Sequence, residues 1–191
     1  MLDKNPHQIL NNDLEKIKIE FSKNNFNIIL CQRPFLKTEF LNKLVNVTDF
    51  PVIFLDIDLL YSGYVKSRLI KKNDKVTLFR PNKENFNKIL EQVIQIISQE
   101  KCLVIVDTLN GVYNLFEELE SARFVNSTLM LLSSISRKTQ SQIIVCCMTV
   151  KNEEGDWILS PGGKHVINSK NVGRFLLTTN DPKIILKPID I

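Results

Sequence analysis

The chain has 191 residues, of which 43% are hydrophobic and 24% are charged, and its formal net charge is +4. This length and composition predict a single soluble globular domain over residues 1–191. No apolar run approaches the roughly 20 residues of a membrane span, and the N-terminus lacks a cationic-then-apolar signal pattern. We therefore expect an intracellular protein, of the cytoplasm or nucleus, without a membrane partner.

The apolar periodicity predicts strands that alternate with helices along the chain. Continuous apolar strands separated by helices indicate an α/β fold with a mostly parallel sheet covered on both faces, and the last two strands predict a C-terminal antiparallel hairpin. The predicted helices are an N-terminal helix at about 8–25 packed on the domain, 38–45, one capped by Asn82, and 115–138; the predicted strands are 28–31, 52–57, 76–79, 102–106, 143–148, 174–179 and 183–188.

The cysteines and histidines do not predict a disulfide framework or a transition-metal site. Cys31, Cys102 and Cys146 lie inside apolar strand-like runs, and Cys147 is adjacent to Cys146. The two histidines have no cysteine or histidine at ligand spacing, so we expect no metal beyond a magnesium ion that accompanies a nucleotide.

The stretch NIILCQRPFLKTEFLNKLV has the layout of a phosphate-binding loop without its glycines. Against G-x-x-x-x-G-K-[ST], Lys37 and Thr38 are in register, whereas Cys31 and Leu36 occupy the glycine positions. Glycine allows backbone N–H groups to wrap a phosphate, but Leu36 brings a branched side chain there and Pro34 removes one donor. The alternative interpretation is a Lys-Thr pair at the start of a helix, with Thr38 near its N-terminus.

Polar residues also follow two further predicted strands. Lys37 and Thr38 come after the first strand, Asp56 and Asp58 after the second, and Asp107 after the fourth. A lysine for phosphate, a hydroxyl for Mg²⁺ and a strand-terminal aspartate for the metal's water shell form an NTPase set at the carboxyl edge of a parallel sheet. Taken singly, Asp107 could cap a loop and Asp58 could be a solvated turn residue.

In this order the motifs resemble the core domain of RecA/RadA-type recombinases, over about residues 27–177. VIFLDID resembles the strand that ends in Asp-Thr-Glu, with Asp58 at the position of the water-activating Glu. LVIVDTLNGV resembles the Walker B strand, with Asp107 as the Mg²⁺-side carboxylate. ELESARFVNSTLMLLSSISRKTQSQIIVCC resembles the Ala-Arg-Gln segment, with Arg123 at its Arg, and SPGGKHVINSKNVGRFLL resembles the turn and strand that close the second DNA loop.

The resemblance implies a three-layer RecA-like fold of the P-loop NTPase type. It places Asp58 at the catalytic position, Lys37, Thr38 and Asp107 at the nucleotide, and Mg²⁺ at Thr38 and Asp107. Three departures from the family's motifs argue against ATPase activity. Both glycines of the phosphate-binding loop are absent, Asp58 is shorter than Glu, and the family's Asn-Gln after the strand at 143–148 is replaced. We also find no helix-hairpin-helix or Phe-x-x-Ala segment. These losses predict a degenerate ATPase that holds Mg-ATP weakly at most.

The resemblance also places two DNA-facing loops, near residues 111–121 and 149–159. The first is acidic, which repels phosphate. In the second, a base could stack on Trp157 while lysines neutralise the backbone; the alternative is that Trp157 packs on the sheet. The DNA-binding candidates are Lys151, Trp157, Lys164, Lys170 and Arg123, and a second basic cluster comprises Lys66, Arg68, Lys71, Lys72 and Lys75.

The sequence therefore predicts a RecA/RadA paralog that acts as an accessory or mediator in DNA recombination or repair. Its expected partners are single-stranded DNA and a recombinase or RecA-like paralog, in a homo- or hetero-oligomer. One alternative is a structural assembly subunit without DNA or ATP activity, like the Elongator accessory subunits or a KaiC-like scaffold. The second alternative is a weak DNA-stimulated ATPase, since Lys37, Thr38, Asp58 and Asp107 remain chemically competent if the loop can open.

Overall fold

The computed structural model describes residues 17–116, 118–160, 171–180 and 183–189, with the backbone alone at 118–120. Strands and helices alternate through most of this range, as the apolar periodicity predicts. The elements are β1 (Phe26–Cys31), α2 (Pro34–Val47), β2 (Val52–Asp56), α3 (Leu60–Lys66), β3 (Val76–Phe79), α4 (Phe86–Gln99), β4 (Leu103–Asp107), α5 (Leu109–Leu115), α6 (Glu118–Thr139), β5 (Gln142–Lys151), β6 (Trp157–Leu159), β7 (Gly173–Asn180) and β8 (Lys183–Pro188).

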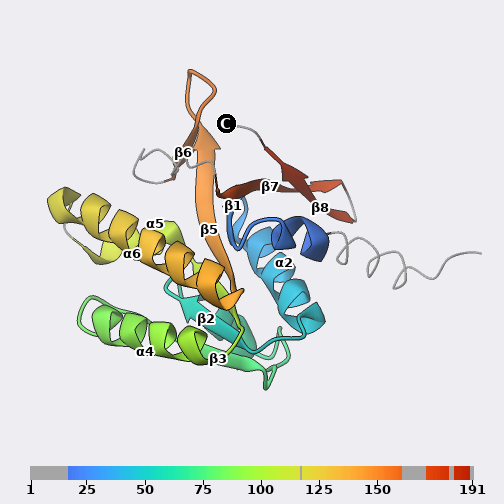
Figure 1. Cartoon of the computed structure of the whole chain (residues 1–191). Coiled ribbons are helices and arrows are strands. Elements are labelled where there is room, and N and C mark those ends of the chain that lie inside the picture. The colour runs from blue at the N-terminus through green and yellow to red at the C-terminus, as the bar shows by residue number, and fades with distance from the viewer. Residues whose placement is uncertain (1–16, 117, 161–170, 181–182, 190–191) are drawn as a thin grey trace, which may run out of the picture.

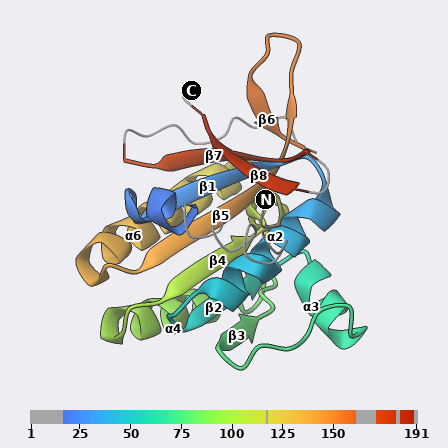
Figure 2. The ribbon, with the colours of Figure 1, turned by 90° about the vertical axis from the view of Figure 1, so that its right-hand side faces the viewer.

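The strands form one mixed sheet in the order β3-β2-β4-β5-β1-β7-β8, and β6 pairs with β5 beyond this path (Figure 1). The pairs from β3 to β7 are parallel, whereas β7 and β8 are antiparallel. The predicted mostly parallel sheet and C-terminal antiparallel hairpin are therefore confirmed. Strand β5 has ten residues, and its end forms an antiparallel hairpin with β6 that projects from the body (Figure 2).

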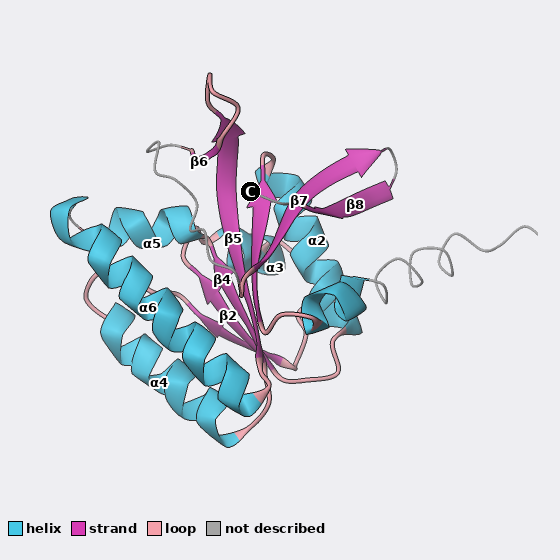
Figure 3. Cartoon of the chain, turned by 45° about the horizontal axis from the view of Figure 1, so that its top comes forward, coloured by secondary structure: helices cyan, strands magenta, loops and turns pink. Residues whose placement is uncertain are grey.

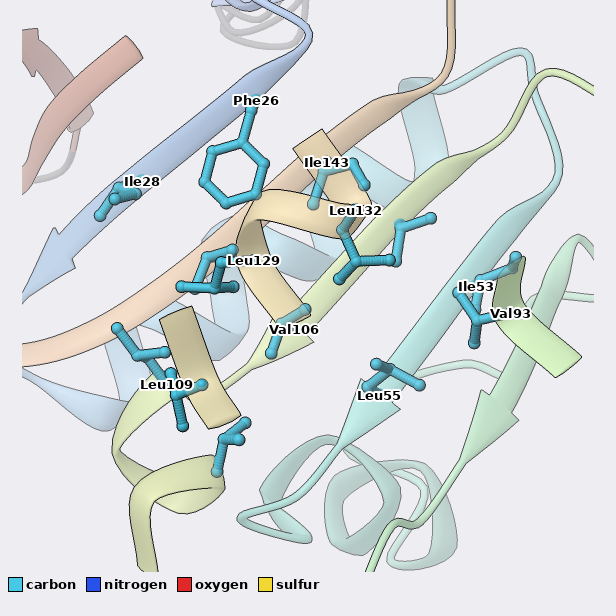
Figure 4. Close-up of a cluster of buried hydrophobic side chains, with 14 of the residues drawn as sticks. Phe26, Ile28, Ile53, Leu55, Val93, Val106, Leu109, Leu129, Leu132 and Ile143 are labelled. Carbon is cyan, nitrogen blue, oxygen red and sulfur yellow. The ribbon is translucent and has the colours of Figure 1, made fainter. Parts of the chain in front are cut away.

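Helices cover both faces of the sheet, because alternate side chains of each buried strand point to opposite faces (Figure 3). In β1, Phe26, Ile28 and Leu30 pack under α4, α5 and α6, in the cluster that Figure 4 shows. The intervening Ile29 and Cys31 pack under α2 and α3. The two cores leave the carboxyl ends of the parallel strands at one edge of the sheet.

Helix α2 begins at Pro34, four residues earlier than predicted. Proline is favoured in the first helical turn, where its missing N–H has no intrahelical acceptor. Only Gln32 and Arg33 separate β1 from α2, so the predicted loop is instead a short link followed by the first turn of a helix. The prediction was wrong because Pro34 was interpreted as a lost donor and not as a helix start.

Two further predictions about helices are corrected. The predicted helix at 115–138 corresponds to α6, which begins three residues later, and a separate helix that was not predicted, α5, starts at Leu109 directly after β4. Asn82 does not cap α4, which begins at Phe86. Its side-chain oxygen accepts hydrogen bonds from the N–H groups of Glu84 and Asn85, in the turn before the helix.

Of the predicted N-terminal helix, residues 17–22 are described and helical, and Phe21 is buried against Phe40 and Phe175. The predicted helix ends too late, since residues 23–25 form a turn before β1, and its first part, up to residue 16, lies outside the described residues. So do Lys164, His165 and Lys170 with the turn that precedes them.

Replacement of Gly173 by alanine should destabilise the native state by about 1–3 kcal/mol through overpacking. Gly173 pairs with Asn27 across β7 and β1, and an added Cβ would lie 2.1 Å from Asn27 Oδ1. Asn27 cannot readily move away, because it is fully buried and its Nδ2 donates to the carbonyls of Phe21 and Asn24. Chemical denaturation measures the effect. The control is Gly63→Ala in α3, where no atom lies within 4 Å of the added Cβ; equal losses for both would contradict this packing account.

Candidate functional site

Lys37, Asp58 and Asp107 come together at the carboxyl edge of the sheet. Lys37 is 1% exposed and its Nζ forms an ion pair with Asp107 Oδ1. The same Nζ lies 3.4 Å from Asp58 Oδ2. The Asp107 side chain is fully buried, whereas that of Asp58 is 31% exposed. Two of the predicted nucleotide residues and the predicted catalytic residue therefore form one ion cluster that lies mostly inside the protein.

The positions of Lys37 and Asp107 follow from the helical period of α2 and the strand alternation of β4. Because α2 starts at Pro34, Lys37 lies on the helix face that carries Leu41 and Leu44 into the core. In β4, Leu103 and Ile105 face α2, so the next residue in alternation, Asp107, faces α2 as well. The lysine and the aspartate thus meet under the helix.

Thr108, which is not among the predicted site residues, orders the exposed side of the cluster. Its Oγ1 donates to the Asp58 carboxylate, at 2.9 Å from Oδ2, and accepts the N–H of Gly111 at 3.1 Å. An added Cβ on Gly111 would lie 2.6 Å from Asp58 Oδ1, so the first turn of α5 and Asp58 are in close contact. The hydroxyl that directly follows the strand-terminal aspartate is the sequence signal that could have identified it.

Asp56 and Thr38 lie near the cluster but have other partners. Asp56 is buried and accepts the N–H groups of Tyr61 and Ser62, at 3.3 and 2.7 Å, so it satisfies the N-terminus of α3. The hydroxyl of Thr38 is buried one turn inside α2 and donates to the carbonyl of Pro34 at 3.1 Å. The geometry thus leaves Thr38 as a core residue of α2.

The pKa values of the buried pair follow from burial and mutual attraction. Burial raises the pKa of Asp107 from 3.8 to about 6, and the charge of Lys37 only partly opposes this rise. Burial alone would lower the pKa of Lys37, but attraction to Asp107, with smaller contributions from Cys146 and Asp58, outweighs it and raises this pKa above its ordinary value. At neutral pH the pair is therefore ionised, although Asp107 Oδ2 has no hydrogen-bond partner among the described residues.

This arrangement opposes the binding of a nucleotide phosphate. Two carboxylates already face the single ammonium of Lys37. If Lys37 turned to an external phosphate, Asp107 would stay buried and unpaired, which costs about 3–5 kcal/mol. In addition, the two-residue link between β1 and α2 provides no run of backbone N–H groups for a phosphate to contact. The internal ion pair prevails over phosphate binding unless a ligand offsets that cost.

The predicted DNA loops have different structures from those expected. Residues 111–121 lie in α5 and at the start of α6, so they are largely helical. Residues 149–159 form the β5–β6 hairpin, in which Lys151 pairs with Trp157 and its Nζ lies 5.4 Å from the centroid of the Trp157 ring. Trp157 packs partly against the core beneath α6. Arg123 is exposed on α6.

The tip of this hairpin is acidic. Glu153, Glu154 and Asp156 are exposed there, and Lys151 is the adjacent cation. Backbone phosphates are repelled by such a tip. Among the described residues, the second predicted DNA loop therefore offers one aromatic ring and one lysine beside three carboxylates.

No family model matches the chain, and no curated protein matches its sequence. None of the described helices is long and apolar enough to cross a membrane. The functional assignment consequently depends on the site itself and on the resemblance of its motifs.

Proposed function

We propose that the chain is a RecA-like accessory subunit of DNA recombination or repair that binds single-stranded DNA or a recombinase without hydrolysing ATP. The observation that carries this proposal is the buried pairing of Lys37 with Asp107. An ATPase needs its lysine ammonium for the nucleotide phosphates and its strand-terminal carboxylate for the metal. Here the two groups neutralise each other inside the protein.

The layout of the fold supports the RecA-like part of the proposal. Lys37 follows β1, Asp58 follows β2 and Asp107 ends β4, and all three lie at the carboxyl edge of a mostly parallel sheet between two layers of helices. This is the place where ligands bind in open α/β sheets. The cluster therefore lies where open α/β sheets bind ligands, but the internal ion pair of Lys37 and Asp107 occupies the groups that a nucleotide would need.

A fluorescence-anisotropy titration of labelled single-stranded DNA, at several salt concentrations and with or without Mg-ATP, tests the proposal. We expect micromolar or tighter binding that weakens with salt and does not change with Mg-ATP, because phosphate neutralisation releases counterions. Dependence on Mg-ATP would contradict the proposal and favour the weak DNA-stimulated ATPase. That alternative requires Lys37 to leave Asp107.

A structural assembly subunit without DNA activity is the second candidate function. The acidic tip of the β5–β6 hairpin favours it, because a projecting acidic hairpin suits a basic protein surface better than a nucleic acid. Absence of DNA binding at low salt, together with a defined oligomer in sedimentation, would support this candidate and contradict the first.

A further inference from the structure

An exposed aromatic ring of α2 lies beside α3, and a group of exposed cations lies at the end of α3 and in the segment that follows it. Phe35 is 65% exposed in the first turn of α2, and its ring centroid lies 6.3 Å from that of Tyr64 in α3. Figure 2 shows α3 beside α2. We call the whole group the aromatic–basic surface; it comprises Phe35, Tyr64, Lys66, Arg68, Lys71 and Lys72.

The cations of this surface are available to an external partner. Lys66, Arg68, Lys71 and Lys72 are exposed, and none of them forms an ion pair with a described residue. Lys75 is excluded from the surface because its Nζ donates to the carbonyl of Thr48. Four unpaired positive charges within seven residues produce a strong local attraction for anions.

The backbone that carries these cations is ordered where it leaves α3. After α3 the chain turns through Arg68, whose φ is 63°, and the N–H groups of Leu69 and Ile70 both donate to the carbonyl of Tyr64. Ile70 is 8% exposed and packs in the core beneath α2. These anchors flank Lys66 and Arg68 and directly precede Lys71 and Lys72, so less backbone entropy is lost when a ligand orders the segment.

We propose that the aromatic–basic surface is the single-stranded DNA site of this protein, an inference that rests on the proposed function. A base stacks on the exposed face of Phe35, and successive phosphates lie along Lys66, Arg68, Lys71 and Lys72. Aromatic stacking combined with a basic track is the usual mode of single-strand recognition without base specificity. Because the tip of the β5–β6 hairpin is acidic, the aromatic–basic surface matches a polyanion better than that hairpin does.

Two variants with matched controls test the site in the anisotropy titration with labelled oligo-dT. Lys71→Glu/Lys72→Glu should weaken binding at least tenfold at about 50 mM salt and make the salt dependence shallower, since about 0.7 counterion is released for each phosphate neutralised on a single strand. Phe35→Ala should weaken binding about tenfold with an unchanged salt slope, because stacking is not ionic. The controls are Lys88→Glu/Lys138→Glu and Met130→Ala, which change exposed residues of α4 and α6 on the opposite side of the sheet.

The outcomes separate this inference from the proposed function. If the wild type binds oligo-dT and the control pair weakens it as much as Lys71→Glu/Lys72→Glu, only net charge matters and the site is wrong while the function stands. If the wild type does not bind at low salt, the proposed function fails and the site fails with it. If Phe35→Ala and Lys71→Glu/Lys72→Glu keep full DNA affinity but shift the sedimentation coefficient, the surface binds protein and the DNA assignment is overturned.

Discussion

Replacement of Lys37 by methionine should destabilise the native state by about 3–5 kcal/mol at neutral pH, because it leaves the buried Asp107 without its cationic partner. Methionine has a similar length and fills the same space, so the loss reports the charge rather than a cavity. The measurement is the free energy of unfolding in denaturant. At this size of effect the variant has lost a large share of the stability of an ordinary domain.

A double variant and a matched control test the cause of this loss. Lys37→Met/Asp107→Leu removes both charges, and we expect it to be much more stable than Lys37→Met, since an apolar replacement of a buried pair is often neutral or favourable. Lys43→Met breaks a pair with Glu39 on the solvent side of the same helix, where the lysine is 28% exposed, and should cost less than about 1 kcal/mol. A double variant no more stable than Lys37→Met would contradict an uncompensated Asp107 as the cause.

The stability conferred by Asp107 should fall as the pH rises from about 3.5 to 7. Burial raises the pKa of Asp107 from 3.8 to about 6, so between these values the native state binds a proton that the unfolded state has released. The contribution of Asp107 to stability is therefore complete below its pKa in the unfolded state, and it is lost as the pH rises through its pKa in the native state. A difference of about two pKa units corresponds to about 3 kcal/mol.

The difference in unfolding free energy between the wild type and Asp107→Asn isolates this effect, because asparagine does not titrate. We expect the wild type to lose about 3 kcal/mol relative to the variant between pH 3.5 and pH 7. The raised pKa of Lys37 acts only at alkaline pH, where its contribution is lost as the pH rises through the folded pKa, so it does not alter this window. A difference that stays constant or grows with pH would mean that Asp107 remains ionised throughout.

Much of the fold could be predicted because each element carries a strong local pattern. The runs VIFLD and LVIVD are buried on both sides, which is typical of central parallel strands, and they lie where predicted within one residue. For LNGVYNL, in contrast, the sequence predicts partly a loop and partly the start of a longer helix. Their helix depends on Thr108, whose hydroxyl caps Gly111, and that cap is evident only after the strand is known to end at Asp107.

The sequence predicts where the candidate site lies, but not which contacts its side chains make. Alternation along β4 and the strand order bring Lys37, Asp58 and Asp107 to one edge, as the motif order suggested. The burial of Lys37 could not be deduced by comparison with a phosphate-binding loop, because such a comparison assumes a loop where Pro34 starts a helix. The helical period counted from Pro34 places Lys37 on the core face, and this is the sequence signal for an internal ion pair.

The thermal unfolding midpoint in millimolar Mg-ATP tests most directly whether Lys37 pairs with Asp107 or binds a nucleotide. We predict that Mg-ATP leaves the midpoint unchanged. A ligand present at about 100 times its dissociation constant would stabilise the native state by about 2.7 kcal/mol, which raises the midpoint by several degrees in a protein of this size. Such a rise, if it disappeared in Lys37→Met/Asp107→Leu, would show that Lys37 leaves its internal partner for the nucleotide and would contradict the account.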